Sequence, residues 1–111
     1  MTRLIWLALS LIVALPLAAG ETLSVERQQE LRNLLIQDCG SCHGLTMRGG
    51  LGPALLPEML QGKPREYITH VILEGRPGTA MPGWRPLLSA DEASWMADML
   101  LEGGLSQEGR Q

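Results

Sequence analysis

The chain has 111 residues, which is the length of one small domain, and its formal net charge at pH 7 is −3. A mildly acidic chain without basic runs is not typical of a nucleic-acid-binding protein, so we expect no nucleic acid as a partner. Aromatic residues make up 4% of the sequence and Phe is absent. A chain of this length with so few large side chains has difficulty building a core alone.

The N-terminus has the pattern of a secretory signal peptide. Arg3 precedes an apolar run over residues 4–17, broken only by one serine and one proline, and small residues follow at 18–20. The run is short for a bilayer span, which disfavours the alternative of a retained membrane anchor. We predict removal of residues 1–20, cleavage after residue 19 or 20, and a single periplasmic domain of residues 21–111 without stable membrane association.

A first helix is predicted over about Val25 to Gln37. Ser24 is suited to cap its N-terminus because a serine hydroxyl can accept from a free amide of the first turn. Leu31, Leu34 and Leu35 recur at helical spacing and would form one apolar face. This helix delivers the chain into the motif that follows it.

The pentad Cys39-Gly40-Ser41-Cys42-His43 is the attachment pattern of haem c. The two cysteines lie about one helical turn apart, so both sulfurs can face one edge of a porphyrin and bond its two vinyl groups. The histidine projects from the same turn and its imidazole can reach the iron as an axial ligand. The two small residues between the cysteines do not crowd the ring.

Other kinds of site use some of the same residues. A zinc site would need four ligands, which Cys39, Cys42, His43 and His70 could supply, but two consecutive ligands fit the paired spacing of tetrahedral zinc sites poorly. A thioredoxin-like redox pair would follow a strand in a βαβ pattern, and neither is visible. A local disulfide is conceivable in an oxidising compartment. Covalent haem is favoured, because a porphyrin would also supply the apolar bulk that the composition lacks.

Residues 44–53 are rich in glycine, which predicts a loop whose backbone passes close to something flat or bulky. A phosphate-cradling loop is the competing interpretation, but the Gly-Lys-Ser/Thr ending and the preceding strand are missing. Pro53 offers a carbonyl oxygen, and a ligating histidine usually donates its second ring N–H to such an acceptor. We therefore expect the Pro53 carbonyl to fix the tautomer of His43, the alternative being a simple turn proline.

Two further helical segments are predicted in the middle of the chain. Residues 55–60 form a short apolar piece, in which Met59 is expected to fill the core rather than bind iron. Pro64 begins an amphipathic helix that stops at Gly75. His70 falls on the polar face of that helix, which favours a solvated histidine over a ligand.

The segment from residue 76 to residue 84 contains two prolines and two glycines around Met81, which predicts a stiff loop instead of a helix. A thioether ligand needs such a loop to approach the iron from the side opposite His43, and it raises the reduction potential. Met81 is the preferred second ligand, ahead of Met59, Met47 and His70. Trp84 could bind a haem propionate through its indole N–H or fill core beside the ring.

The last predicted helix opens with a capping box, Ser89 to Glu92, and runs to about Leu101. Met96 and Met99 recur at helical spacing within it, so core packing is their expected role. Two glycines end the helix. No segment of the chain has a convincing strand pattern, and the fold class is therefore all-α.

These motifs together resemble those of class I cytochromes c. The matching parts are the CGSCH pentad, residues 51–53, residues 78–82 and the capped C-terminal helix. The resemblance implies a compact fold of three main helices and loops around one covalent haem, with the first and last helices crossing. It also implies the site residues: thioethers at Cys39 and Cys42, and axial ligands His43 and Met81.

More narrowly, residues 49–59 and 75–84 resemble the small periplasmic cytochrome of denitrification gene clusters, the NirC type. That resemblance implies a monomeric electron carrier that donates electrons to the nitrite reductase carrying haems c and d1. A role in maturing haem d1 is also implied for this group. A haem enzyme or gas sensor with a labile Met ligand is a further alternative, but the residues include no paired carboxylates or activated nucleophile.

The chain departs from the wider family in two respects. Leu34 stands where such cytochromes often carry an aromatic residue against the last helix. Without the signal peptide the chain has one lysine, so no ring of lysines surrounds the haem. Electrostatic docking would then depend on Arg48, Arg76 and Arg85, the alternative being that these are a scattered, solvated set.

Overall fold

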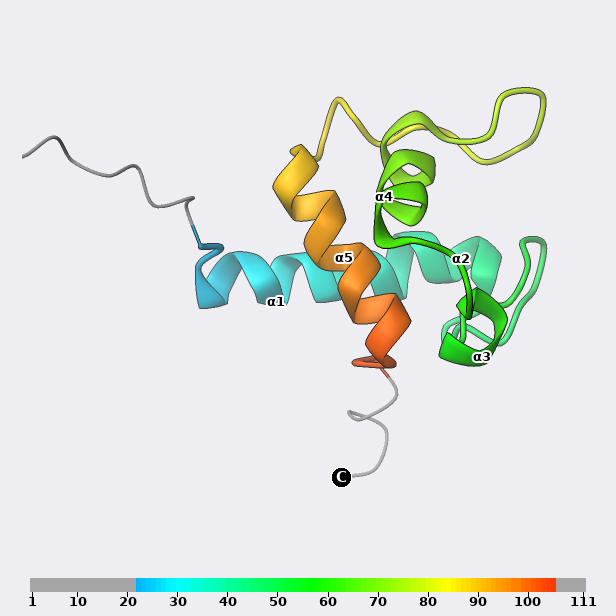
Figure 1. Cartoon of the computed structure of the whole chain (residues 1–111), viewed down its shortest axis with the longest axis horizontal. Coiled ribbons are helices and arrows are strands. Elements are labelled where there is room, and N and C mark those ends of the chain that lie inside the picture. Colours follow the sequence, from blue (N-terminus) through cyan, green and yellow to red (C-terminus); the bar gives the residue numbers. More distant parts are fainter. Residues whose placement is uncertain (1–21, 106–111) are drawn as a thin grey trace, which may run out of the picture.

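The computed structural model describes residues 22–105, and the predicted signal peptide lies outside them. The elements, in chain order, are α1 (Val25–Leu34), a π-helical turn (Leu35–Cys39), α2 (Gly40–His43), α3 (Pro57–Leu60), α4 (Arg65–Glu74) and α5 (Ala90–Glu102) (Figure 1). No strand occurs within the described residues. The all-α prediction is confirmed.

The first helical rod is longer than predicted. As expected, the Ser24 hydroxyl caps α1 by accepting from the amide of Arg27 at 3.1 Å. The prediction that the helix ends near Gln37 is wrong, because the helical backbone continues through the π-helical turn to His43. The Gly40 amide donates to the Leu35 carbonyl across this wide turn.

The π-helical turn changes which residues face the interior. One extra residue rotates the following helix by about 100° relative to an uninterrupted α-helix. Leu31 and Leu35 are fully buried before the turn, and Gly40 and His43 are buried after it, whereas Asp38 is exposed. His43, after the turn, therefore lies on the buried face, and Asp38 lies on the exposed face.

Helix α5 crosses α1 at a steep angle, as the resemblance to class I cytochromes implied (Figure 1). The Arg27 guanidinium on α1 donates to the Glu92 carboxylate on α5. Arg32 lies over the Trp95 ring at 5.8 Å from its centroid. Leu34, at the position where such cytochromes often carry an aromatic residue, is half-buried and packs against the core. Polar contacts thus supplement aliphatic packing at this crossing.

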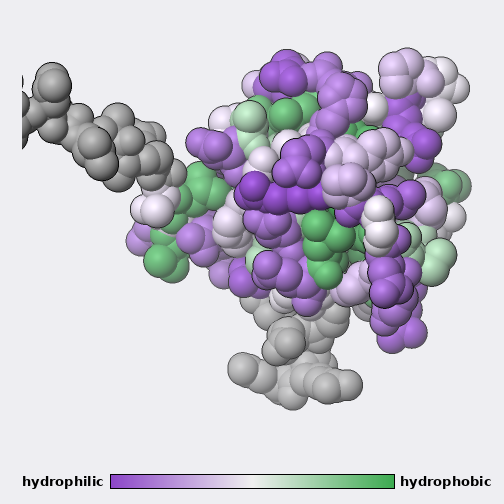
Figure 2. Space-filling view, in the orientation of Figure 1, coloured by the Kyte–Doolittle hydropathy of each residue, from purple (hydrophilic) through white to green (hydrophobic). Residues whose placement is uncertain are grey.

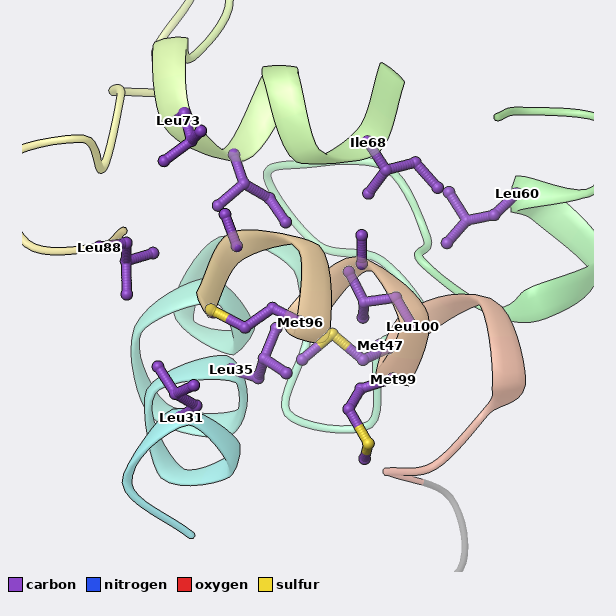
Figure 3. Packing of buried hydrophobic residues seen from close by; sticks show 13 residues of the cluster. Leu31, Leu35, Met47, Leu60, Ile68, Leu73, Leu88, Met96, Met99 and Leu100 are labelled. Carbon is purple, nitrogen blue, oxygen red and sulfur yellow. The ribbon is translucent and has the colours of Figure 1, made fainter. Parts of the chain in front are cut away.

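The fully buried part of the core is aliphatic. Figure 3 shows Leu35 beside Met96 of α5, with Ile68 and Leu73 of α4 on the other side. The buried apolar residues are Leu31, Leu35, Met47, Leu60, Ile68, Ile72, Leu73, Leu88, Ala93, Met96, Ala97, Met99 and Leu100. Trp84 and Trp95 pack against this cluster but are only partly buried. The expected core roles of Met96 and Met99 are confirmed.

Two other predictions about side chains have opposite outcomes. Met59, expected in the core, is 59% exposed, because α3 is a single turn that directs only Leu60 inward. His70 is exposed on α4, as predicted. Exposed hydrophobic residues lie in separate groups among hydrophilic ones on the face seen in Figure 2. No helix within residues 22–105 is long and apolar enough to cross a membrane.

Candidate haem-binding site

The two cysteines lie on one helical turn. Cys39 ends the π-helical turn with αR backbone angles, and α2 follows directly, so Cys42 is one turn further along the same rod. Both thiols are free, which contradicts the alternative of a local disulfide. The Cys42 thiol is exposed, and Cys39 is half-buried. The arrangement presents two sulfurs at the spacing that covalent haem attachment requires.

The described residues around Cys39 do not form a zinc site. Burial, and then the nearby Asp38 carboxylate, raise the pKa of Cys39 to about 11. A tetrahedral zinc site would need further ligands beside the two thiols. No three His, Cys, Asp or Glu side chains come together as a metal site anywhere in residues 22–105. The alternative of a zinc site that includes His70 is therefore wrong.

The imidazole of His43 is held in one orientation by Pro53. The ring nitrogen Nδ1 lies 2.7 Å from the Pro53 carbonyl oxygen, which accepts only if Nδ1 carries the proton. The Nε2 atom then has a free lone pair for a metal. The residue is only 9% exposed. This is the hydrogen bond by which proteins fix ligating histidines.

Gly52 makes room for the His43 ring. A Cβ atom at this position would lie 2.8 Å from the ring atoms Cε1 and Nδ1, which is too close for real side chains. Any larger residue would therefore push the imidazole away from its position. The sequence indicated a close approach within residues 44–53, but it did not indicate which glycine meets which group.

The loop that holds Pro53 is tied to the end of α2 by backbone hydrogen bonds. The Gly49 amide donates to the His43 carbonyl, and the Gly52 amide donates to the Cys42 carbonyl, both at 2.8 Å. These bonds satisfy carbonyls that a helix C-terminus leaves without partners. The loop and the histidine it orients are thereby one rigid unit.

Met81 lies in a non-helical loop, as predicted, and is half-buried. Its carbonyl accepts from the Arg76 amide at 3.2 Å. The loop leaves and rejoins α4 at Gly75 and Gly83, where an added Cβ would lie 2.6 Å from backbone atoms of the opposite side. Only glycine at both positions permits this closure.

The two loops lie at the same end of the molecule. Figure 1 shows the loop after α2 and the loop after α4 both projecting beyond the helices at the right-hand side. Trp84 immediately follows the second loop, and its amide donates to the Ile72 carbonyl at 3.0 Å. The donor set at this end comprises two thiols, an imidazole with a free Nε2 and a thioether, which is the chemistry that fits a covalent haem c.

Known proteins resemble the chain over most of its length. The family described as cytochrome C oxidase, cbb3-type, subunit III matches residues 26–100. Cytochrome c55X of Pseudomonas aeruginosa is 56% identical over 104 residues, which cover 92% of this chain and 87% of that protein. The structure of the c-type cytochrome NirC matches with a TM-score of 0.72 and 60% identity, covering 74% of this chain and 96% of that one.

A larger protein shares part of the sequence. Dihydro-heme d1 dehydrogenase of Pseudomonas aeruginosa is 42% identical over 82 residues, which cover 74% of this chain but only 15% of that protein. The segment in common is therefore a small part of that protein. Taken with the helical fold and the donor set, these matches show that the chain belongs to the cytochrome c family, with the covalently bound haem c that this implies, and that it is a class I cytochrome of the NirC type.

Proposed function

We propose that the protein is a periplasmic monohaem cytochrome that donates electrons to the nitrite reductase carrying haems c and d1. The observation that carries this proposal is the orientation of His43, whose Nδ1 is bonded to Pro53 and whose Nε2 is left free beside two thiols on one helical turn. The similarity to NirC supports a role in denitrification.

Each site residue has one role in this proposal. Cys39 and Cys42 would hold the haem through thioethers, and His43 and Met81 would bind its iron. Pro53 keeps His43 in the tautomer that leaves Nε2 free, and Trp84 contacts the ring or a propionate. The bound haem would supply a one-electron iron couple whose potential the thioether ligand raises.

The surroundings of both ligands favour electron transfer over catalysis. His43 is held by a hydrogen bond, a glycine notch and a hydrogen-bonded loop, and Met81 sits in a loop closed by two glycines. Ligands held in this way keep their positions in both oxidation states of the metal. An iron bound by both residues would have no coordination position left for a substrate, which disfavours the enzyme and gas-sensor alternatives.

The location in the periplasm depends on residues 1–20, which lie outside the described part of the chain. Their signal-peptide pattern supports export and cleavage near residue 20. The intact mass of the exported protein should equal residues 20–111 or 21–111 plus one haem. A mass that includes the N-terminal run, or more than one haem, would contradict this proposal.

Stopped-flow mixing tests the electron-transfer role. The reduced holoprotein is mixed with oxidised nitrite reductase, and its reoxidation is followed by absorbance. We expect rapid second-order oxidation that slows at high salt, because small redox partners form weak and fast encounter complexes. Absence of electron transfer, with a correctly liganded haem in both proteins, would rule out nitrite reductase as the partner.

A role in haem d1 maturation is the second candidate. The similarity to dihydro-heme d1 dehydrogenase favours it, since that enzyme's name assigns it to chemistry on a haem d1 precursor. The shared segment is a cytochrome unit, so exchange of electrons with such an enzyme is better supported than storage of haem d1. Tight binding of free haem d1 to the holoprotein, without electron transfer to nitrite reductase, would favour this candidate.

A further inference from the structure

We propose that Thr79 is a positioning residue for the Met81 sulfur, because its hydroxyl group fixes the backbone from which that side chain projects. This inference rests on the proposed role of Met81 as an iron ligand. It adds a residue that neither the attachment motif nor the ligand pair contains.

The Thr79 hydroxyl bridges two backbone groups of the loop. It donates to the Arg76 carbonyl oxygen at 2.7 Å and accepts from the Met81 amide at 3.3 Å. The Thr79 amide donates to the same Arg76 carbonyl at 3.1 Å. One side chain therefore connects the beginning of the loop to the residue that carries the sulfur.

Both backbone polar groups of Met81 are bonded inside the loop. Its carbonyl accepts from the Arg76 amide at 3.2 Å, which is a contact between backbone atoms. Its amide, in contrast, depends on the hydroxyl of Thr79. Substitution at Thr79 can thus remove one of the two constraints on the Met81 backbone and leave the other in place.

The loop has few other constraints between its ends. Gly75 and Gly83 anchor the ends by close backbone packing, but residues 76–80 are all exposed. No buried side chain within residues 76–80 can therefore hold the middle of the loop. An exposed loop with few contacts opens readily. Each hydrogen bond that remains, including those of the bridging hydroxyl, therefore reduces how often Met81 leaves its proposed ligating position.

Substitution of Thr79 in the holoprotein tests this role. Thr79→Val keeps the shape of the side chain and removes the hydroxyl, and Thr79→Ser keeps the hydroxyl. In Thr79→Val we expect hydrogen exchange of the Met81 amide in the reduced protein to be about tenfold faster. We also expect the Met-to-ferric-iron charge-transfer band to be lost at a lower pH than in the wild type, with Ser restoring both properties.

Thr46→Val is the matched control. Thr46 is an exposed threonine in the other loop, and its hydroxyl makes no hydrogen bond within residues 22–105. It should leave the Met81 exchange rate and the band unchanged. If Thr79→Val does not load haem, the same comparison made with Thr79→Ala decides the question.

The outcomes separate this inference from the proposed function. A wild-type protein with the charge-transfer band, and a Thr79→Val variant identical to it in exchange rate and pH profile, would overturn the role of Thr79 alone. A wild-type protein that lacks the band would overturn ligation by Met81 and the role of Thr79 with it. If Thr79→Val changes the exchange rate and the pH profile but Thr79→Ser changes them equally, the role of the Thr79 hydroxyl is also overturned.

Discussion

At the scale of single residues, the position of the His43 ring depends on the absence of a side chain at Gly52. The His43 ring occupies the space that a Cβ at Gly52 would take, and its Nδ1 reaches the Pro53 carbonyl one residue further on. The glycine and the proline act together, since the first makes room for the imidazole and the second fixes its rotation. The orientation of the His43 ring is thus determined by the backbone of residues 52 and 53.

Substitution of Gly52 by alanine should displace the imidazole. The added methyl group would lie 2.8 Å from the ring, and overpacking of this kind costs about 1–3 kcal/mol. We expect a changed Soret spectrum and a lower reduction potential in Gly52→Ala, measured by absorbance and redox titration. Gly62→Ala is the control, because nothing lies within 4 Å of its Cβ position; it should lose about 1 kcal/mol of stability through its positive φ alone and keep the wild-type spectrum.

If Met81 binds the iron as proposed, substitution of Met81 by alanine should open one coordination position. We expect the ferric charge-transfer band near the red edge of the spectrum to disappear, and carbon monoxide to bind readily to the reduced protein. Met59→Ala, which alters an exposed methionine on α3, should retain the band and exclude carbon monoxide. A wild-type protein that itself binds carbon monoxide readily would contradict ligation by Met81.

The sequence predicted residue types better than their surroundings. The attachment pentad, the proline acceptor and the methionine loop could be selected because their chemistry is specific. Met59 was placed wrongly because periodicity does not reveal that α3 is a single turn, in which only Leu60 is directed inward. The contact between Gly52 and His43 joins residues nine positions apart through a loop, and no periodic pattern encodes such a contact.

At the scale of secondary-structure elements, the capping box of α5 also connects that helix to α1. The Ser89 hydroxyl accepts from the Glu92 amide at 3.1 Å, and the Glu92 carboxylate accepts from the Ser89 amide at 3.0 Å. The same carboxylate accepts from Arg27 on α1. The hydrogen bond from Arg27 lowers the pKa of Glu92 below its ordinary value.

The contribution of Glu92 to stability should depend on pH. Because its pKa is lower in the folded protein, the unfolded chain takes up the proton first as the pH falls. The stabilisation is therefore complete well above pH 4.5, the ordinary value, and is lost as the pH falls below it. Urea unfolding at pH 7 should show Glu92→Gln less stable than the wild type by about 1 kcal/mol, with a smaller difference at pH 4. Asp91→Asn, in the same turn, should not reproduce this pattern.

Helix boundaries were predictable where caps mark them, and not elsewhere. The ends of α4 and α5 agree with the prediction because Pro64, Gly75, Ser89 and Gly103 carry recognised terminal signals. The end of the first rod does not agree, because a π-helical turn has no comparable signal in the sequence. Its hydrogen bond from Gly40 to Leu35 precedes the buried His43, and burial depends on tertiary packing that a local pattern does not encode.

At the scale of the whole molecule, ion pairing divides the arginines that were expected to dock a partner. Of the three expected arginines, Arg48, Arg76 and Arg85, the last is paired with Glu74. Arg65, which was not among them, is paired with Asp98. Arg48 and Arg76 are exposed, without a salt bridge in the described part of the chain, and lie in or beside the two loops that carry the candidate haem-binding residues. Unpaired cations contribute most to the attraction of an acidic partner.

Neutralising these two arginines should slow association with the proposed partner, nitrite reductase. We expect the second-order rate constant at low salt to fall about tenfold in the double variant Arg48→Gln, Arg76→Gln, and its dependence on salt to weaken. Arg65→Gln removes a paired charge outside the loops and should change the rate less than about twofold. An effect of Arg65→Gln about half as large as that of the double variant would show that net charge, and not this pair, controls the encounter.

The partly buried indoles of Trp84 and Trp95 against an aliphatic core have an optical consequence. In a domain this small, both rings would lie well within the range of resonance energy transfer to a porphyrin, so a loaded chain would be almost dark under ultraviolet excitation. The residual tryptophan fluorescence of a purified sample would then measure the fraction of chains without haem.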